Sequence, residues 1–421
     1  MDASQRRRRP LEGIRIADLT IVVAGPTATG VLGDLGAEVI KIEHIVARGD
    51  TSTALPKAPH VDEDRPYNRG NWFHDLNRSK NAITLNFVVP EARELFKRLV
   101  AVSDVVVQNF SPRVMENHGL TYHTLREVKP DIIMASLPGF GMDGPMRNRT
   151  SFGPGIEAMT GLGDLTGFPD GPPMKPGNFV TDYTAGMMAA FAIMAALHYR
   201  KRTGKGQHLE LAMRDGALQF IGEPLMDYAM NGRVQSRIGN RHPAMAPHGV
   251  YPCRGEDMWV AIAVGSDDEW ERLRSALGDP DWARDERFAT VTGRLRHQDE
   301  IDPHLSEWTK QRSHYAAMHT LQASGIDAGA VLTTKEIGTD PHYDARQFMQ
   351  PVYIPEAGPV RLSRQGFKLS ETPGEISAGP NFAAGNHYVF HDLLGLNETQ
   401  LADLEAKQAI AWKPVTQMGR I

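Results

Sequence analysis

The chain has 421 residues, of which 41% are hydrophobic and 23% charged, a composition typical of globular proteins long enough for two or three domains. Its net charge of −5 gives no general attraction for nucleic acid, and we interpret the basic run from Arg6 to Arg9 as a solvated tail rather than a nucleic-acid arm. The longest apolar run is shorter than the roughly 20 residues of a membrane span. The single cysteine, Cys253, excludes internal disulfides, so we expect a cytoplasmic protein with no membrane segment.

The first half of the chain alternates strand and helix signals. Strand signals cover 14–19, 37–43, 83–87, 104–108 and 131–136, and helix signals cover 27–36 and 90–100. This alternation predicts an α/β fold with a Rossmann-like, doubly wound parallel sheet. Ligands bind such sheets beyond the carboxyl ends of the strands, so we expect residues 20–26, 43–44, 109–113 and 137–141 to line one crevice.

Two segments without periodicity interrupt this pattern. Residues 45–80 are rich in Pro, His, Asp and Asn, and residues 153–177 are rich in Gly and Pro. Long loops of this kind are lids, disordered segments or ordinary surface excursions, and the sequence leaves these alternatives open.

Asp182 begins a long apolar helix that ends in a cationic segment and the Gly204-Lys205-Gly206 turn. Because helix N-termini carry unpaired N–H groups and partial positive charge, we expect the pKa of this carboxyl group to be lowered. An ionised carboxylate at this position can act as a nucleophile. Asp is also a preferred capping residue, so a purely structural role is the alternative.

The second half has a different organisation. From Gln207 onward, strand signals at 208–212, 249–253 and 258–263 resemble hairpins, and helix signals follow at 267–277 and 303–312. We therefore predict a large domain over 1–206, a linker and small α+β domain over 207–335, and a return segment over 336–421 that completes the large domain.

Two cofactor classes are disfavoured. The turn Ala24-Gly25-Pro26 lacks the G-x-G-x-x-G pattern, and Pro26 removes an N–H where a pyrophosphate would need one, so we predict no NAD site. The sixteen histidines show neither H-E-x-x-H nor pairing with cysteine, so we predict no metal site.

Several segments together resemble the class III CoA-transferases. They are Leu11 to Ile16, Ala24-Gly25-Pro26, Leu35 to Glu43, Asn77 to Lys80, Gln108 to Pro112, Asp182 with Gly186, Arg202 to Gln207, and Gly385-Asn386-His387. The similarity covers nearly the whole chain. It rests on the order and spacing of these strings, since none of them is specific alone.

The resemblance implies that Asp182 is the catalytic nucleophile. Its carboxylate would attack the thioester of an acyl-CoA, giving a mixed anhydride and then an aspartyl-CoA thioester, before CoA passes to a carboxylic acid acceptor. Coenzyme A would be the carrier. The family also implies an interlocked homodimer of ring-like subunits.

The resemblance also assigns binding residues by position. Val23 and Ala24 would lie near the thioester, and Gly239 and Asn240 would border the acyl pocket, with His248 as a further substrate-side candidate. The body of CoA would contact Leu85, Asn109, Phe110 and Ser111.

The chain departs from the family pattern at three positions. Val23 stands where members acting on formyl-CoA have Gln, and His44 and Asn117 stand where Arg is found. The substrate is therefore expected to be larger than formate. Phosphate binding would pass to other guanidinium groups, for which the candidates are Arg113, Arg147 and Arg149.

Two further functions remain open alternatives. An α-methylacyl-CoA racemase shares the fold, but Ser151 to Gly155 occupies the region of its Gly-His-Asp stretch, so the proton-handling His has no counterpart. A non-catalytic acyl-CoA-binding protein is the other alternative, and the presence of Asp182 argues against it.

Overall fold

The computed structural model describes residues 8–46, 65–356 and 358–415, so Arg6, Arg7 and residues 47–64 of the aperiodic segment 45–80 lie outside the described residues. The chain divides into two compact units. The first combines Met1–Leu162, Lys175–Met226 and Asp344–Ile421, and the second combines Gly163–Met174 and Asp227–Tyr343.

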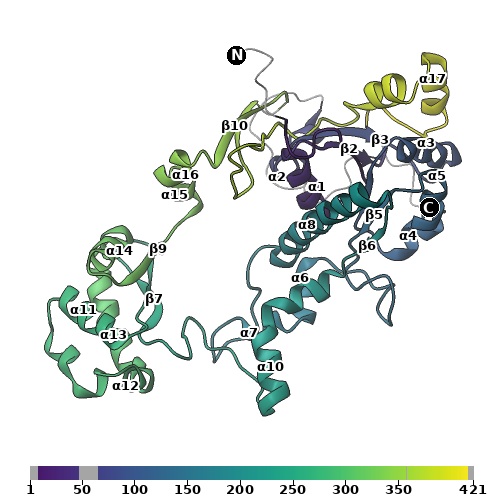
Figure 1. The fold of residues 1–421 in the computed structure, drawn as a ribbon. Helices are drawn as coiled ribbons and strands as arrows, with labels where there is room; N and C mark the ends of the chain where they lie inside the picture. The colour runs from purple at the N-terminus through teal and green to yellow at the C-terminus, as the bar shows by residue number, and fades with distance from the viewer. Residues whose placement is uncertain (1–7, 47–64, 357, 416–421) are drawn as a thin grey trace. The chain divides into compact units, whose positions relative to one another are not determined.

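A six-stranded parallel sheet forms the centre of the first unit (Figure 1). Its strands are β1 (Arg15–Asp18), β2 (Glu38–Glu43), β3 (Lys80–Thr84), β4 (Val105–Gln108), β5 (Ile133–Ser136) and β6 (His208–Glu210). They lie in the order β3-β2-β1-β4-β5-β6, and every neighbouring pair is parallel. This is the order of a doubly wound sheet. The predicted α/β class with a parallel sheet is therefore confirmed.

Two strands differ from the sequence expectations. β3 begins at Lys80, because its polar first residues pair with Val39 and Ile40 of β2. β6 was expected in a hairpin of the small domain, but it pairs in parallel with β5 as the sixth strand of the large sheet. Parallel neighbours need a long crossover connection, and the 24-residue helix α8 (Val180–Thr203) provides it.

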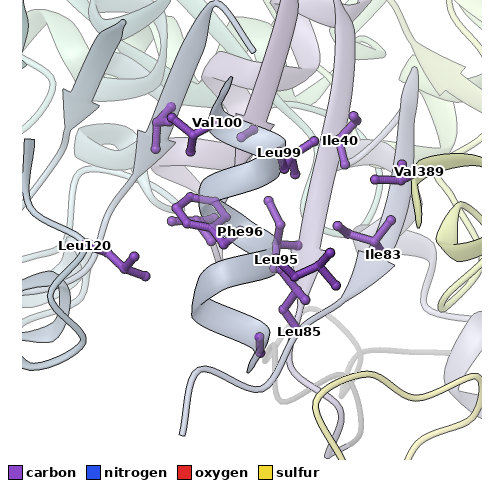
Figure 2. Close-up of a cluster of buried hydrophobic side chains, with 14 of the residues drawn as sticks. Ile40, Ile83, Leu85, Leu95, Phe96, Leu99, Val100, Leu120 and Val389 are labelled. Carbon is purple, nitrogen blue, oxygen red and sulfur yellow. The ribbon is translucent and has the colours of Figure 1, made fainter. Parts of the chain in front are cut away.

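Alternating side chains along each strand determine the two layers that cover the sheet. On β1, Ala17 faces one apolar cluster and Ile16 faces the other. The first cluster is covered by α3 (Pro90–Ala101), whose side chains pack onto the strands in Figure 2. Those of α3 labelled there are Leu95, Phe96, Leu99 and Val100.

The opposite face of the sheet is covered by α1 (Ala24–Asp34) and α8. A Cβ on Gly186 of α8 would lie 2.6 Å from the carbonyl oxygen of Ala24, so this glycine permits close packing of the two helices. Among the described residues, α8 is the one helix long and apolar enough to cross a membrane, and half of its most apolar window is buried within the fold. The expectation that this segment is too short for a span was therefore wrong, since the helix extends beyond the apolar run.

Shorter helices connect these elements. They are α2 (Asn71–Leu76), α4 (Pro112–Asn117), α5 (Tyr122–Val128), α6 (Gly153–Met159) and α9 (Met213–Leu218). Two more helices, α7 (Leu162–Leu165) and α10 (Gly222–Asn231), begin in the first unit and end in the second. 

The C-terminal segment packs against the edge of the large sheet of the first unit. It contains the hairpin β10 (Met349–Ile354) and β11 (Gly358–Ser363), a π-helix at His387–Leu393, and α17 (Glu398–Ala406). Asn386 accepts a hydrogen bond from the backbone N–H of Thr84, whose hydroxyl donates to the carbonyl of Ala411. Residues far apart in the sequence therefore close the edge of the sheet at β3.

The second unit contains an antiparallel sheet in the order β7-β8-β9. The strands are β7 (His248–Pro252), β8 (Trp259–Ala263) and β9 (Asp327–Val331). The helices are α11 (Asp267–Ala276), α12 (Val291–Arg296), α13 (Gln298–Lys310), α14 (His314–Ala323), α15 (Thr334–Gly338) and α16 (Pro341–Ala345). The last residues of α16 belong to the first unit. Trp270 is the largest fully buried side chain of its core.

Candidate active site

Helix α8 carries Asp182 in its first turn, as the third helical residue. Phe179, before the helix, has a left-handed backbone with φ of 60°, which is uncommon for a bulky residue. Asp182 is only 5% exposed, and within the described part of the chain its Oδ2 atom has no hydrogen-bond partner. Buried polar atoms are nearly always bonded, so this orphan oxygen favours a chemical role over a capping role.

The surroundings of Asp182 raise its pKa. Burial is the largest cause, the nearby carboxylate of Glu157 adds like-charge repulsion, and together they raise the pKa of Asp182 to about 6 although its own backbone N–H opposes them. The expectation of a lowered pKa was therefore wrong, because desolvation outweighs the field of the helix N-terminus. The carboxylate is still mainly ionised at neutral pH, and it is more basic than an ordinary aspartate.

Helix α6 forms the wall beside this carboxylate. A Cβ on Gly153 would lie 1.6 Å from Oδ2 of Asp182, so a side chain at this position would displace the carboxylate. Glu157, one turn later, is 1% exposed, and its Oε1 atom accepts a 3.4 Å bond from the N–H of Thr181. Its Oε2 atom has no partner among the described residues. Two buried carboxylates thus lie near each other, and no cationic side chain of the described residues is among the groups that shift the pKa of Asp182.

The start of α1 lies against the start of α8. Val22 has a left-handed backbone with φ of 64°, which is strained for a β-branched residue, and Val23 is the N-cap of α1. Ala24 and Ala185 belong to one buried apolar cluster. The structure therefore brings Val23 and Ala24 close to the helix that carries Asp182, and the first N–H groups of α1 have no partners within that helix.

A buried polar network holds the turn between β1 and α1. Asp18, at the end of β1, accepts bonds from the N–H of Thr20 (2.9 Å), the hydroxyl of Thr29 (2.7 Å) and the ammonium of Lys80 (3.0 Å). Lys41 donates to the carbonyl of Thr20 at 2.8 Å. Burial opposes the charge of Asp18, but Lys80 and Lys41 keep its pKa below the usual range.

A pocket of about 330 Å³ lies at the carboxyl ends of the strands. Two of the predicted CoA contacts, Leu85 and Phe110, line it together with Lys41, His44 and Phe73. Burial lowers the pKa of His44, although a hydrogen bond with Asn86 opposes this, so the imidazole is neutral at pH 7. The pocket is mainly apolar, which suits a flat aromatic group rather than a phosphate.

The other two predicted CoA contacts are Asn109 and Ser111, which follow strand β4. The side-chain amide of Asn109 accepts from the N–H of Ile21 at 2.9 Å and donates to its carbonyl at 2.8 Å. Asn109 therefore fixes the β1–α1 turn just before Val23. Ser111 is the N-cap residue of α4 and makes no side-chain capping bond.

The three arginines predicted to bind phosphate do not line the 330 Å³ pocket. Arg147 forms an ion pair with Glu116 at 2.6 Å. Arg113 and Arg149 are exposed. The structure therefore does not bring these guanidinium groups together with Leu85 and Phe110.

Gly239, Asn240 and His248 lie in the second unit, whereas Asp182 lies in the first. All three line a pocket of about 610 Å³ over the β7-β8-β9 sheet. Nδ1 of His248 lies 2.7 Å from the carbonyl oxygen of Asn240, and Gly239 has a φ of +61°. The structure thus brings these three candidates together as one group.

Sequence reasoning missed Glu157 and Gly153 as neighbours of Asp182. The signal available was the glycine-rich string 151–155, which we interpreted as the place where a racemase histidine is absent and, from residue 153 onward, as an aperiodic segment rather than as a helix. The approach of α6 to α8 is a tertiary contact, so a single sequence without structure could not reveal it.

Comparison with known proteins identifies the family. The family model described as CoA-transferase family III matches residues 11–387. The succinyl-CoA–D-citramalate CoA-transferase of Chloroflexus aurantiacus is 37% identical over 97% of this chain and 100% of its own length. The succinate–glutarate CoA-transferase of Agrobacterium fabrum is 34% identical, over 87% of this chain and 91% of its own.

A solved structure agrees with the fold. The crystal structure of a CAIB/BAIF family protein from Brucella suis superimposes with a TM-score of 0.83 at 32% identity, covering 92% of this chain and 100% of that one. The chain therefore belongs to CoA-transferase family III. The prediction of an enzyme of the CoA-transferase class is confirmed by this membership.

Proposed function

We propose that the chain transfers CoA between two carboxylic acids with Asp182 as the covalent nucleophile. The observation that carries this proposal is the buried carboxylate itself, whose Oδ2 atom has no partner among the described residues and whose pKa is raised to about 6. Such a group is ionised at neutral pH yet poorly solvated, and both properties favour attack on a carbonyl carbon.

The reaction consists of four balanced substitutions. Asp182 attacks the thioester carbonyl of the donor, the C–S bond breaks, and CoA leaves as a thiolate. The thiolate then attacks the aspartyl carbonyl of the mixed anhydride, which releases the donor acid and leaves an aspartyl-CoA thioester. The carboxylate of the acceptor attacks this thioester and displaces the thiolate again. The thiolate finally attacks the acceptor's carbonyl, and Asp182 is regenerated as a carboxylate.

The surroundings of Asp182 support each step. The two negative charges that develop are an oxyanion and a thiolate, and the N-terminus of α1 offers partial positive charge and N–H groups that have no partner within the helix. The like charge of Glu157 destabilises the carboxylate of Asp182, which favours its conversion to a neutral acyl form. Leu85 and Phe110 provide an apolar pocket for the body of CoA.

We propose short-chain dicarboxylic acids as the substrates. Relatives of this chain are named for succinyl-CoA with D-citramalate and for succinate with glutarate. Val23 supports this choice, since an apolar side chain beside the thioester suits a longer acyl group than formyl.

We further propose that the chain acts as a homodimer. The face of α8 opposite its buried side exposes Tyr183, Met187 and Phe191, which are spaced four residues apart and are 37%, 49% and 72% exposed. An apolar stripe of this size supports burial against a second copy. The interlocked arrangement is proposed from the family resemblance. A cytoplasmic location is proposed from the single cysteine.

Trapping the acyl enzyme tests the mechanism. The protein is incubated with succinyl-CoA and then with hydroxylamine, and the peptide containing Asp182 is examined by mass spectrometry. We expect a hydroxamate on Asp182 and transfer of CoA to glutarate or citramalate. Turnover without an adduct at Asp182 would remove the nucleophile. Exchange of an α-proton of the acyl group without CoA transfer would favour the racemase alternative instead.

A further inference from the structure

A cluster of ligand-type side chains lies in the C-terminal segment, outside the site of Asp182. His387, His391 and Asp392 each present one potential metal-binding atom, and these atoms lie within 4.8 Å of one another. Both imidazole rings are accessible, with side chains 55% and 43% exposed. The rings stack with their centroids 4.7 Å apart.

The π-helical conformation of His387–Leu393 creates this cluster. A π-helix has hydrogen bonds between residues five apart, and the N–H of Leu394 bonds the carbonyl of Val389 in this way at 3.0 Å. In an α-helix, residues five apart point in different directions. The wider turn brings Asp392 beside His387, so that Nδ1 of His387 lies 3.8 Å from Oδ2 of Asp392.

A second carboxylate lies near the first imidazole. Oε1 of Glu398, the first residue of α17, lies 3.6 Å from Nε2 of His387. When Nε2 carries the proton, the Nδ1 atom on the side of Asp392 has a lone pair that can bind a cation. Metal-binding histidines commonly have a carboxylate on the nitrogen that does not bind the metal.

The chemistry of the cluster matches a borderline divalent cation. Two imidazole nitrogens and one carboxylate oxygen are ligands that Zn²⁺ and Ni²⁺ accept, at about 2.0–2.2 Å for Zn²⁺. Mg²⁺ and Ca²⁺ prefer oxygen ligands only. Nδ1 of His391 now bonds Oδ1 of Asp392 at 2.8 Å, and a cation would replace the proton between them.

We propose that His387, His391 and Asp392 form a binding site for one Zn²⁺-like transition-metal ion per chain, with Glu398 as a positioning residue. The site would tie the π-helix to the start of α17, in the segment that closes the sheet next to β3. The histidines of the sequence lack H-E-x-x-H and cysteine patterns, which is why no metal was predicted, and two histidines four residues apart are a weaker signal. This proposal is independent of the CoA-transferase mechanism.

Metal titration of the full chain tests the site. Chelator-treated protein is titrated with ZnCl₂ by isothermal calorimetry, and Co²⁺ absorption reports the coordination. We expect one ion per chain, and about tenfold or greater loss of affinity in His387→Ala, His391→Ala and Asp392→Asn. Glu398→Gln should weaken binding by a smaller factor, since it affects only the orientation of His387.

A matched control separates this site from nonspecific binding. His319 is an exposed histidine of α14, so His319→Ala should leave the affinity unchanged. All four ligand-site residues are partly or fully exposed, and unchanged circular dichroism would verify that the variants fold. The proposal is overturned if the wild-type protein binds no Zn²⁺ at micromolar concentration, or if the His387→Ala, His391→Ala double variant binds it as tightly as the wild type.

Discussion

Asp18 and Asp182 are both buried aspartates of the first unit, but their surroundings are opposite. Asp18 is fully buried and bonded to Lys80, Thr20 and Thr29, and the lysines hold its pKa below the usual range against the effect of burial. Asp182 is buried next to Glu157, has an Oδ2 atom without a partner among the described residues, and has a pKa raised to about 6.

This difference separates a charge used for structure from a charge available for chemistry. A buried ion pair costs desolvation on both sides and recovers it only when the partners and hydrogen bonds are complete, as around Asp18. A buried carboxylate without such compensation destabilises the folded state and is retained where function requires it. Substitutions that remove or exchange these surroundings test the distinction.

The largest expected effect is on turnover when Asp182 loses its charge. Asp182→Asn keeps the shape of the side chain but removes the nucleophile, so we expect CoA transfer to fall by at least about 10³-fold. Initial rates with succinyl-CoA and glutarate provide the measurement, and CoA affinity measured by calorimetry should change little. Transfer at more than a tenth of the wild-type rate would contradict the assignment.

The same substitution should not destabilise the fold. The pKa of Asp182 is raised in the folded state, so its protonated form stabilises the protein at low pH and this stabilisation is lost as pH rises through about 6. At pH 7 the ionised group therefore costs free energy, and Asp182→Asn should raise the free energy of unfolding by about 1–3 kcal/mol. Urea unfolding at pH 7 measures it. A loss of stability would show that Asp182 has a structural role instead.

Asp18 should respond to substitution in the opposite way. Lys80→Met leaves Asp18 buried without its principal cation, and breaking a buried ion pair costs about 3–5 kcal/mol of unfolding free energy. Lys97→Met, which removes an exposed pair with Glu94 on α3, is the matched control and should cost less than about 1 kcal/mol. Equal losses in the two variants would contradict the assignment of Asp18 to a structural network.

The fold could be predicted from the sequence where the strands are buried on both faces. Val105-Val106-Val107 is a continuous apolar run, as expected for a central parallel strand, and its boundaries were predicted closely. β3 was placed three residues too late because its first residues, Lys80 and Asn81, are polar. Lys80 can occupy a buried strand because its ammonium group pairs with Asp18, and that contact is visible only in three dimensions.

The candidate active site could be predicted only in part from the sequence. The position of Asp182 followed from its helix and from the family resemblance, whereas the direction of its pKa shift did not. That direction depends on burial and on Glu157, which approaches from a separate helix. The predicted phosphate ligands Arg113, Arg147 and Arg149 were chosen by residue type alone, and the structure does not group them at the pocket lined by Leu85 and Phe110.

Gly153 tests whether Asp182 needs the open space beside it. Gly153→Ala would place a methyl group 1.6 Å from the present position of Oδ2, so the carboxylate must rotate away. We expect turnover to fall by about 10²-fold, since small displacements of a reacting group have effects of this size. Gly222→Ala, where a Cβ meets nothing within 4 Å, is the control and should keep full activity. Similar rates in both variants would contradict the required geometry.

The smallest expected effect concerns the carboxylate pair. Because Asp182 must be ionised to attack, activity should decline as pH falls through about 6. Glu157→Gln removes the like charge but keeps an oxygen that can accept from Thr181, so the pKa of Asp182 should fall and the acidic limb should move to lower pH. Relative to its own value at neutral pH, the variant should retain about two- to fivefold more kcat/KM than the wild type on the acidic side.

The profile is measured between about pH 5 and 8, with Glu116→Gln as a control because Glu116 is exposed and pairs with Arg147. An acidic limb that stays in place would mean that burial alone sets the pKa of Asp182, and a limb that moves upward would mean that Glu157 supplies something other than negative charge. Only a downward shift confined to Glu157→Gln fits a carboxylate kept basic by its neighbour, because burial is the same in both proteins and the charge is the one property that differs.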